Sequence, residues 1–160
     1  MHGRPRLTGV VAAGLGLVLV VALATAFAWW RGRPVDVAVP DGGADPVCAQ
    51  AARALPATVR DRPRTPTTAD SAAVAAWGRD GVIWRCGVAD PGPTTDECVG
   101  VDGVDWVRRP LRDGSAFTAY GRSPAVEVLV PRVAGHPEPL VLPDFSAVVR
   151  GLPQTRECTQ

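Results

Sequence analysis

An uncharged apolar run near the N-terminus is the strongest hydrophobic pattern in the chain. It extends from Leu7 to Trp30. As a helix it would be about 36 Å long, which is enough to cross a hydrocarbon core of about 30 Å. Trp29 and Trp30 stand at its end, where amphipathic rings favour the membrane interface. The pattern predicts a transmembrane helix over residues 7–30, preceded by a basic N-terminus over residues 1–6.

A cleavable signal peptide is the alternative for the same run. Two small-x-small triplets, Ala24-Thr25-Ala26 and Ala26-Phe27-Ala28, fit a cleavage site. The apolar core of a signal peptide is usually shorter than this run, so the pattern favours an uncleaved anchor. In both cases we expect the remainder of the chain to be exported. The protein is then a single-pass cell-membrane protein with an extracytoplasmic C-terminal domain, or it is secreted after cleavage.

The hydrophobic pattern beyond the run changes period along the chain. Residues 31–44 are rich in Pro and Gly and predict a flexible tether. The exported domain then covers residues 45–160. Asp45 and Pro46 fit the N-cap and first position of a helix that ends before Pro56 and turns Cys48 inward. The polar residues 58–68 predict a loop, and Asp70, Ala-rich residues 71–77 and Gly78 predict a second short helix.

Period-2 alternation follows and indicates strands. Residues 82–88 alternate clearly, and Asp102-Gly103 between apolar residues predicts a hairpin or a bulged strand. The remaining elements are strands over 116–120 and 125–130 and a last amphipathic helix around 145–152, capped by Asp144. Short connections favour an antiparallel sheet. We therefore expect an α+β domain of two layers, with two or three short helices on one face of the sheet.

Composition and charge exclude several functions. All 17 basic residues are arginine. Without lysine there is no Walker phosphate loop, Schiff base or Ser-x-x-Lys acyl-transfer site. Four arginines flank the apolar run, which leaves 13 arginines against 16 acidic residues elsewhere. A nucleic-acid partner would need a basic face, and we expect none.

The four cysteines are candidates for a metal site, a redox site or disulfides. Cys86 and Cys98 are separated by eleven residues. Zinc sites typically use Cys-x2–4-Cys and redox centres Cys-x-x-Cys, so neither spacing fits. An exported domain with an even number of cysteines favours structural disulfides. Of the three pairings that are open, we favour Cys86–Cys98, closing a Pro/Gly loop, and Cys48–Cys158, tying the first helix to the C-terminus.

Five side chains form the candidate binding surface. They are Arg85, Trp106, Tyr120, Arg122 and Glu127. Guanidinium forks and aromatic walls suit an anionic or sugar ligand. A purely structural role is the alternative: Trp106 would lie in the core, Arg85 would pair with Glu127 across strands, and Arg122 would shape a turn. His136 lies in a Pro/Gly-rich loop, where we expect a solvated imidazole rather than a catalytic base.

Several of these segments resemble a known family. They are Trp77-Gly78, Arg85-Cys86-Gly87-Val88, Gly103-Val104-Asp105-Trp106 and Phe117-Thr118-x-Tyr120-Gly121-Arg122-x-Pro124-Ala125-Val126-Glu127-Val128. Together, over about residues 48–158, they resemble the actinobacterial domain-of-unknown-function family 3515. The resemblance implies an extracytoplasmic domain behind an N-terminal membrane segment or signal. It implies no activity, cofactor or catalytic residue.

The sequence as a whole predicts a non-enzymatic binding or interaction module of the cell envelope. Its partners would be the membrane, through the N-terminal helix, and an envelope protein or cell-wall component. No cofactor or metal is expected. Two alternatives remain: a small envelope hydrolase that uses paired carboxylates or His136, and an exported solute-binding domain.

Overall fold

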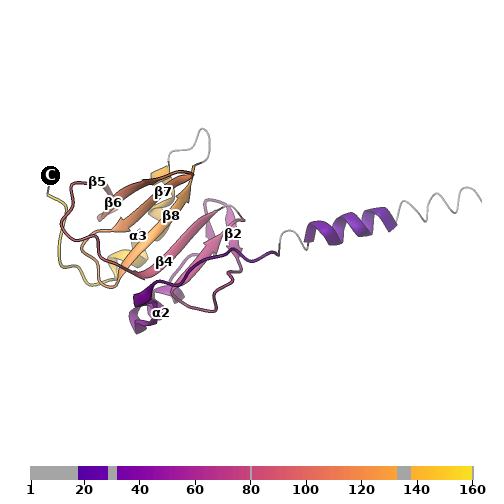
Figure 1. The fold of residues 1–160 in the computed structure, drawn as a ribbon, viewed down its shortest axis with the longest axis horizontal. Helices are drawn as coiled ribbons and strands as arrows, with labels where there is room; N and C mark the ends of the chain where they lie inside the picture. Colours follow the sequence, from indigo (N-terminus) through magenta and orange to yellow (C-terminus); the bar gives the residue numbers. More distant parts are fainter. Residues whose placement is uncertain (1–17, 29–31, 80, 133–137, 160) are drawn as a thin grey trace, which may run out of the picture. The chain divides into compact units, whose positions relative to one another are not determined.

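The computed structural model describes residues 18–28, 32–79, 81–132 and 138–159 (Figure 1). The chain divides into two compact units, Met1–Arg33 and Pro34–Gln160. In the first unit, residues 18–28 are helical; the basic N-terminus and the rest of the apolar run lie outside the described residues. Across the described residues, no helix has both the length and the hydropathy needed to cross a membrane.

The second unit is an α+β domain built on one antiparallel sheet, as the sequence predicts. The sheet has eight strands in the order β1-β2-β3-β4-β8-β7-β6-β5. These strands are β1 (Thr58–Val59), β2 (Arg62–Thr65), β3 (Val74–Trp77), β4 (Val82–Val88), β5 (Glu97–Val101), β6 (Val104–Leu111), β7 (Gly114–Ala119) and β8 (Ala125–Pro131). Two meanders, β1 to β4 and β5 to β8, are therefore joined through the β4–β8 pair (Figure 1).

The main core lies on one face of the sheet, called here the inner face. Helices α2 (Pro46–Arg53) and α3 (Pro143–Arg150) contribute apolar side chains to it. Phe145 of α3 contacts two fully buried tryptophans: its ring centroid lies 5.2 Å from that of Trp77 and 5.6 Å from that of Trp84. Aromatic pairs at such separations add to the free energy gained from area burial.

Two local signals, the Asp45 cap and the Asp102-Gly103 turn, are confirmed. The Asp45 carboxylate accepts a hydrogen bond from the Val47 N–H at 2.7 Å, and α2 begins at Pro46. Asp102 and Gly103 have φ angles of 48° and 74° and connect β5 to β6. Positive φ at both central residues suits the right-handed twist of the paired strands, and Asp-Gly favours it.

The helix predicted over residues 71–77 is wrong. Residues 74–77 form β3, and all four are buried. An apolar run without alternation has no periodicity that separates helix from strand, and pairing with β4 overrides the helix propensity of alanine. The predicted loop over 58–68 is also wrong, because β1 and β2 form a hairpin there. Its turn residue Arg60 donates its N–H to Asp144, which lies within the first turn of α3 rather than at its N-cap.

The residues predicted as a flexible tether lie largely within the domain. Val35 forms a parallel bridge with Thr67, and Val37 is 6% exposed. A short 3-10 helix, η1 (Asp41–Ala44), follows. Gly42 in η1 approaches Gly87 of β4 so closely that a Cβ on Gly87 would lie 2.2 Å from the Gly42 carbonyl carbon. The domain therefore begins before residue 45.

The disulfides are Cys48–Cys86 and Cys98–Cys158, so the predicted pairing is wrong. The sheet order explains the difference. Four inter-strand steps separate β4 from β5, which amounts to about 19 Å across the sheet. Cys86 also lies in the inner-face core, whereas Cys98 pairs in register with Val107 on the opposite face. Cys86 and Cys98 are therefore held far apart, although they are close in the sequence.

Candidate functional site

The outer face of the sheet, opposite the main core, gathers polar side chains from four strands. Cross-strand neighbours share a face, and the registers place Arg85 of β4 beside Glu127 of β8, and Glu127 beside Thr118 of β7. Arg109 of β6 lies opposite Ala116 of β7, one row further along the same face. The strand pairing therefore brings two arginines and one carboxylate together from separate segments.

Glu127 holds this group together. One of its carboxylate oxygens, Oε2, accepts from Arg85 at 3.0 Å, and the other, Oε1, accepts from Arg109 at 3.2 Å. The Glu127 side chain is 7% exposed, whereas that of Arg109 is 58% exposed. Because two guanidinium groups share one carboxylate, several N–H donors of Arg109 face no protein acceptor among the described residues. Such a fork can bind carboxylate, phosphate or hydroxyl oxygens.

These residues form the floor of an open depression of about 670 Å³, which we name the arginine groove. One wall is residues 39–42, which reach into η1, and the other is residues 87–91, the end of β4 and the loop that follows it. The β4–β8 register shifts between Cys86 and Val88, which marks a bulge at Gly87. Bulges often lie beside functional sites because they redirect the strand. Here the bulge lies in the groove wall itself, because Gly87 and Val88 both line the groove.

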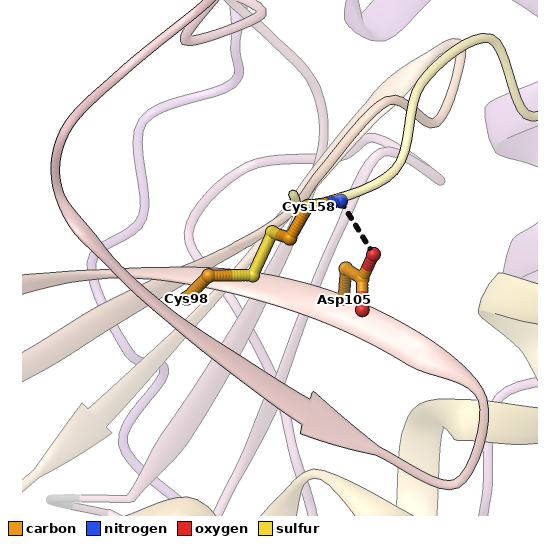
Figure 2. A group of neighbouring side chains, drawn as sticks. All are labelled: Cys98, Asp105 and Cys158. Carbon is orange, nitrogen blue, oxygen red and sulfur yellow. Dashed lines mark hydrogen bonds between the residues drawn. A yellow bond between two sulfur atoms is a disulfide. The ribbon is translucent and has the colours of Figure 1, made fainter. Parts of the chain in front are cut away.

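A second depression, of about 470 Å³, lies on the same face near β5, and we name it the tail pocket. Its floor is formed by Asp105, Val107 and Tyr120, and the C-terminal residues 157–159 line one side. Figure 2 shows the Cys98–Cys158 disulfide beside Asp105, whose Oδ2 accepts the Cys158 N–H at 2.8 Å. The Arg156 guanidinium lies 5.5 Å from the centroid of the Tyr120 ring and pairs with Asp90.

The five predicted surface residues therefore separate into three groups. Arg85 and Glu127 lie in the arginine groove and form the cross-strand pair that the sequence offered as an alternative. Tyr120 lines the tail pocket. Trp106 is fully buried in the core, and Arg122 is 7% exposed, donating to the carbonyl oxygens of Leu152 and Arg150. Neither of these last two forms part of an exposed surface.

The binding surface predicted from the sequence did not include Arg109 or Asp105. A signal for both was present, because the Asp102-Gly103 turn fixes the register of the hairpin. Period-2 alternation from that turn places Asp105, Val107 and Arg109 on one face of β6. His136, the candidate base of the hydrolase alternative, lies outside the described residues.

A polar cluster at the edge of the inner face surrounds Glu138, in the 3-10 helix η2 (Glu138–Val141). Its Oε2 accepts from the Ser115 hydroxyl and from Arg108 at 3.1 Å, and Arg132 lies 3.8 Å from Oε1. The Ser115 hydrogen bond, followed by that of Arg108, lowers the pKa of Glu138 below its ordinary value, against the opposing effect of burial. The ionised carboxylate therefore attaches η2 to the sheet.

We expect Glu138→Gln to reduce stability near neutral pH by about 1–3 kcal/mol, because a buried acceptor of charged hydrogen bonds is weakened. A carboxyl group whose pKa falls on folding stabilises the protein above its unfolded pKa. That stability is lost as the pH falls through the folded pKa. The wild-type and variant unfolding free energies should therefore converge below about pH 4.5. Urea unfolding from pH 7 to pH 3 measures this. Glu97→Gln, whose side chain is 62% exposed, is the control and should stay within about 0.5 kcal/mol of wild type.

The fold and the site define a small α+β domain with two disulfides and an open polar face. The chain belongs to the DUF3515 family, described as a protein of unknown function, whose model matches residues 11–157. This confirms the resemblance drawn from the sequence, and the match begins well before Cys48. No curated protein matched the chain, and no solved structure did so.

Proposed function

We propose that the chain is a non-enzymatic binding module of the cell envelope, and that the arginine groove is its binding surface. The N-terminal apolar run anchors it in the membrane as a single-pass protein, with residues 34–160 extracytoplasmic. The observation that carries the binding role is the Arg85–Glu127–Arg109 group on the floor of an open groove. Its partner is an envelope protein or a cell-wall component that presents acceptor oxygens.

Two features support the extracytoplasmic location. The uncharged run from Leu7 to Trp30 is long enough for a membrane segment. All four cysteines are paired in disulfides. Disulfides persist in oxidising compartments and are rare in a reducing cytosol.

The shape of the groove supports the binding of a macromolecule more than that of a small solute. Small-molecule sites usually enclose most of their ligand in a concave and largely apolar cavity. The floor of the arginine groove is charged, and its most exposed member, Arg109, is 58% exposed. A surface of this kind suits a polar partner that remains partly in solvent.

Photo-crosslinking in intact cells tests the proposal. The chain has no lysine, so amine-reactive reagents are unsuitable. A photoreactive residue in place of Ala89, on the groove wall, should capture an envelope component, whereas one in place of Asp113, on the β6–β7 turn, should not. Arg109→Gln should reduce capture about tenfold, as expected when a charge-assisted hydrogen bond of about 1.5 kcal/mol is lost.

Arg112→Gln is the matched control, because Arg112 is 93% exposed and, within the part of the chain that the structure describes, pairs only with its neighbour Asp113. Capture that is equal from positions 89 and 113, or that Arg109→Gln leaves unchanged, would contradict the groove as the binding surface. An adduct with the mass of a small solute would instead favour the solute-binding alternative. Full release of the chain from membranes by alkaline carbonate would contradict the anchor.

A further inference from the structure

We propose that Cys98, Cys158 and Asp105 form a redox-controlled metal site. When the Cys98–Cys158 disulfide is reduced, the two thiolates and the Asp105 carboxylate bind a thiophilic divalent ion such as Zn²⁺. The same residues therefore hold the C-terminal tail against the sheet in two ways, by a disulfide or by a metal ion. The inference concerns the tail pocket and is independent of the arginine groove.

The three ligands come from three segments that the fold brings together (Figure 2). Cys98 is on β5, Asp105 on β6 and Cys158 on the tail, and their ligand atoms all lie within 4.8 Å of one another. Zn²⁺ binds thiolates at about 2.3 Å, so two thiolates in a tetrahedral shell are about 3.8 Å apart. The two Cα atoms are already 6.5 Å apart, and a small shift of the side chains reaches this geometry.

Asp105 has an oxygen available for a metal. Its Oδ2 accepts the Cys158 N–H, and no hydrogen bond to Oδ1 occurs among the described residues. A carboxylate can therefore keep the tail in place through one oxygen and coordinate an ion through the other. Ligands to a metal are commonly oriented by such backbone hydrogen bonds.

The surroundings favour a cation. The tail pocket has room for a water molecule as a fourth ligand, and it is also lined by the carboxylates of Asp96 and Glu157. Neither Asp96 nor Glu157 is held in a salt bridge within the described residues. The nearest basic side chain on the tail, Arg156, is paired with Asp90. The charged side chains that line the tail pocket are therefore all carboxylates, which favours a cation.

The reduction can be selective. Cys98 is exposed and Cys158 is half-buried, whereas Cys48 and Cys86 are both 0% exposed. Thiol–disulfide exchange requires that a thiolate reach a disulfide sulfur. An external dithiol of an envelope oxidoreductase therefore reaches Cys98–Cys158 and not Cys48–Cys86. The dithiol gives up two electrons and two protons and becomes a disulfide itself, and Cys98 and Cys158 become thiols. Binding of Zn²⁺ then releases both thiol protons to solvent.

Titration of the full-length chain with Co²⁺ and Zn²⁺ tests the site. Mild phosphine treatment should free Cys98 and Cys158 and leave Cys48–Cys86 closed, as mapped by alkylation and mass spectrometry. Reduced chain should bind one Co²⁺ and show a thiolate-to-cobalt charge-transfer band. Added Zn²⁺ should displace the Co²⁺ and abolish the band. Oxidised chain should show no such band.

Two carboxylate variants separate coordination from charge. Asp105→Asn keeps an acceptor for the Cys158 N–H, but it should weaken the metal affinity of the reduced chain at least tenfold, since even indirect ligand partners contribute about 10–100-fold. Asp102→Asn removes a carboxylate from the exposed turn of the same hairpin and should leave the affinity unchanged. The double variant Cys98→Ser/Cys158→Ser should give no band. A reduced chain without the band, or equal affinities for both Asn variants, would overturn the proposal.

Discussion

Replacing Cys48 and Cys86 together by alanine should lower the free energy of unfolding by at least about 4 kcal/mol. The disulfide closes a loop with a sequence separation of 38, for which the chain-entropy model alone gives about 4 kcal/mol. Both sulfur atoms are buried in the core between α2 and β4, so removing them also leaves a cavity. Denaturant unfolding of the oxidised proteins, followed by tryptophan fluorescence, measures the loss.

The second disulfide provides the control for this result. Cys98–Cys158 has a sequence separation of 60, and chain entropy alone would make its removal slightly more costly. It lies at the edge of the sheet, outside the inner-face core. We expect Cys98→Ala/Cys158→Ala to cost less than the Cys48/Cys86 variant, because packing in the core decides the order. The reverse order would show that loop length determines the loss of stability and that Cys48–Cys86 contributes little through packing.

Gly87→Ala should cost about 2–5 kcal/mol. Its φ of 84° is unfavourable for any residue with a Cβ, by about 1–2 kcal/mol. The added methyl group would also lie 2.2 Å from the Gly42 carbonyl carbon, and overpacking typically costs about 1–3 kcal/mol more. The atoms that the methyl group would meet, in Gly42 and Gly43, are all backbone atoms, so no side chain can rotate away. Equilibrium unfolding in urea measures the change.

Gly92→Ala is the matched control. Gly92 also has a positive φ, of 65°, but nothing lies within 4 Å of the position that its Cβ would occupy. We expect a loss of about 1–2 kcal/mol from the backbone conformation alone. If both alanine variants were equally destabilised, the close packing of η1 on the bulge of β4 would not contribute to stability. The Gly87 variant should also disturb the wall of the arginine groove, which the Gly92 variant should leave intact.

Local signals in the sequence were enough to predict several elements. Alternation over Val82–Val88, the Asp102-Gly103 turn and the Asp45-Pro46 start of α2 each depend on interactions between near neighbours. The sequence does not separate strand from helix at residues 74–77, because strand formation there depends on hydrogen bonds to β2 and β4, which are tertiary interactions. The correctly predicted strands and helices are enough to indicate the α+β class, even though one predicted helix and one predicted loop are wrong.

The candidate site was harder to predict because it depends on topology. The Arg85–Glu127 pair can be predicted from the sequence, since opposite charges on strands of similar length suggest a cross-strand contact. The position of β5 at the sheet edge cannot be predicted in this way. The disulfide pairing and the tail pocket both depend on that position, so they cannot be predicted either. Trp106 and Arg122 were misplaced because an aromatic ring and a guanidinium group serve a buried core or a buried carbonyl cluster as well as a surface.

The order of the strands has a consequence for the chain as it emerges during synthesis or export. β4 and β5 follow each other in sequence, but β4 receives its second neighbour only when β8, near residue 131, becomes available. Until then one edge of Val82–Val88 stays open, and a tryptophan-bearing apolar strand with an unpaired edge can pair with other chains. A chaperone that delays folding should therefore recognise β4 first, and a chain truncated before β8 should aggregate through that edge.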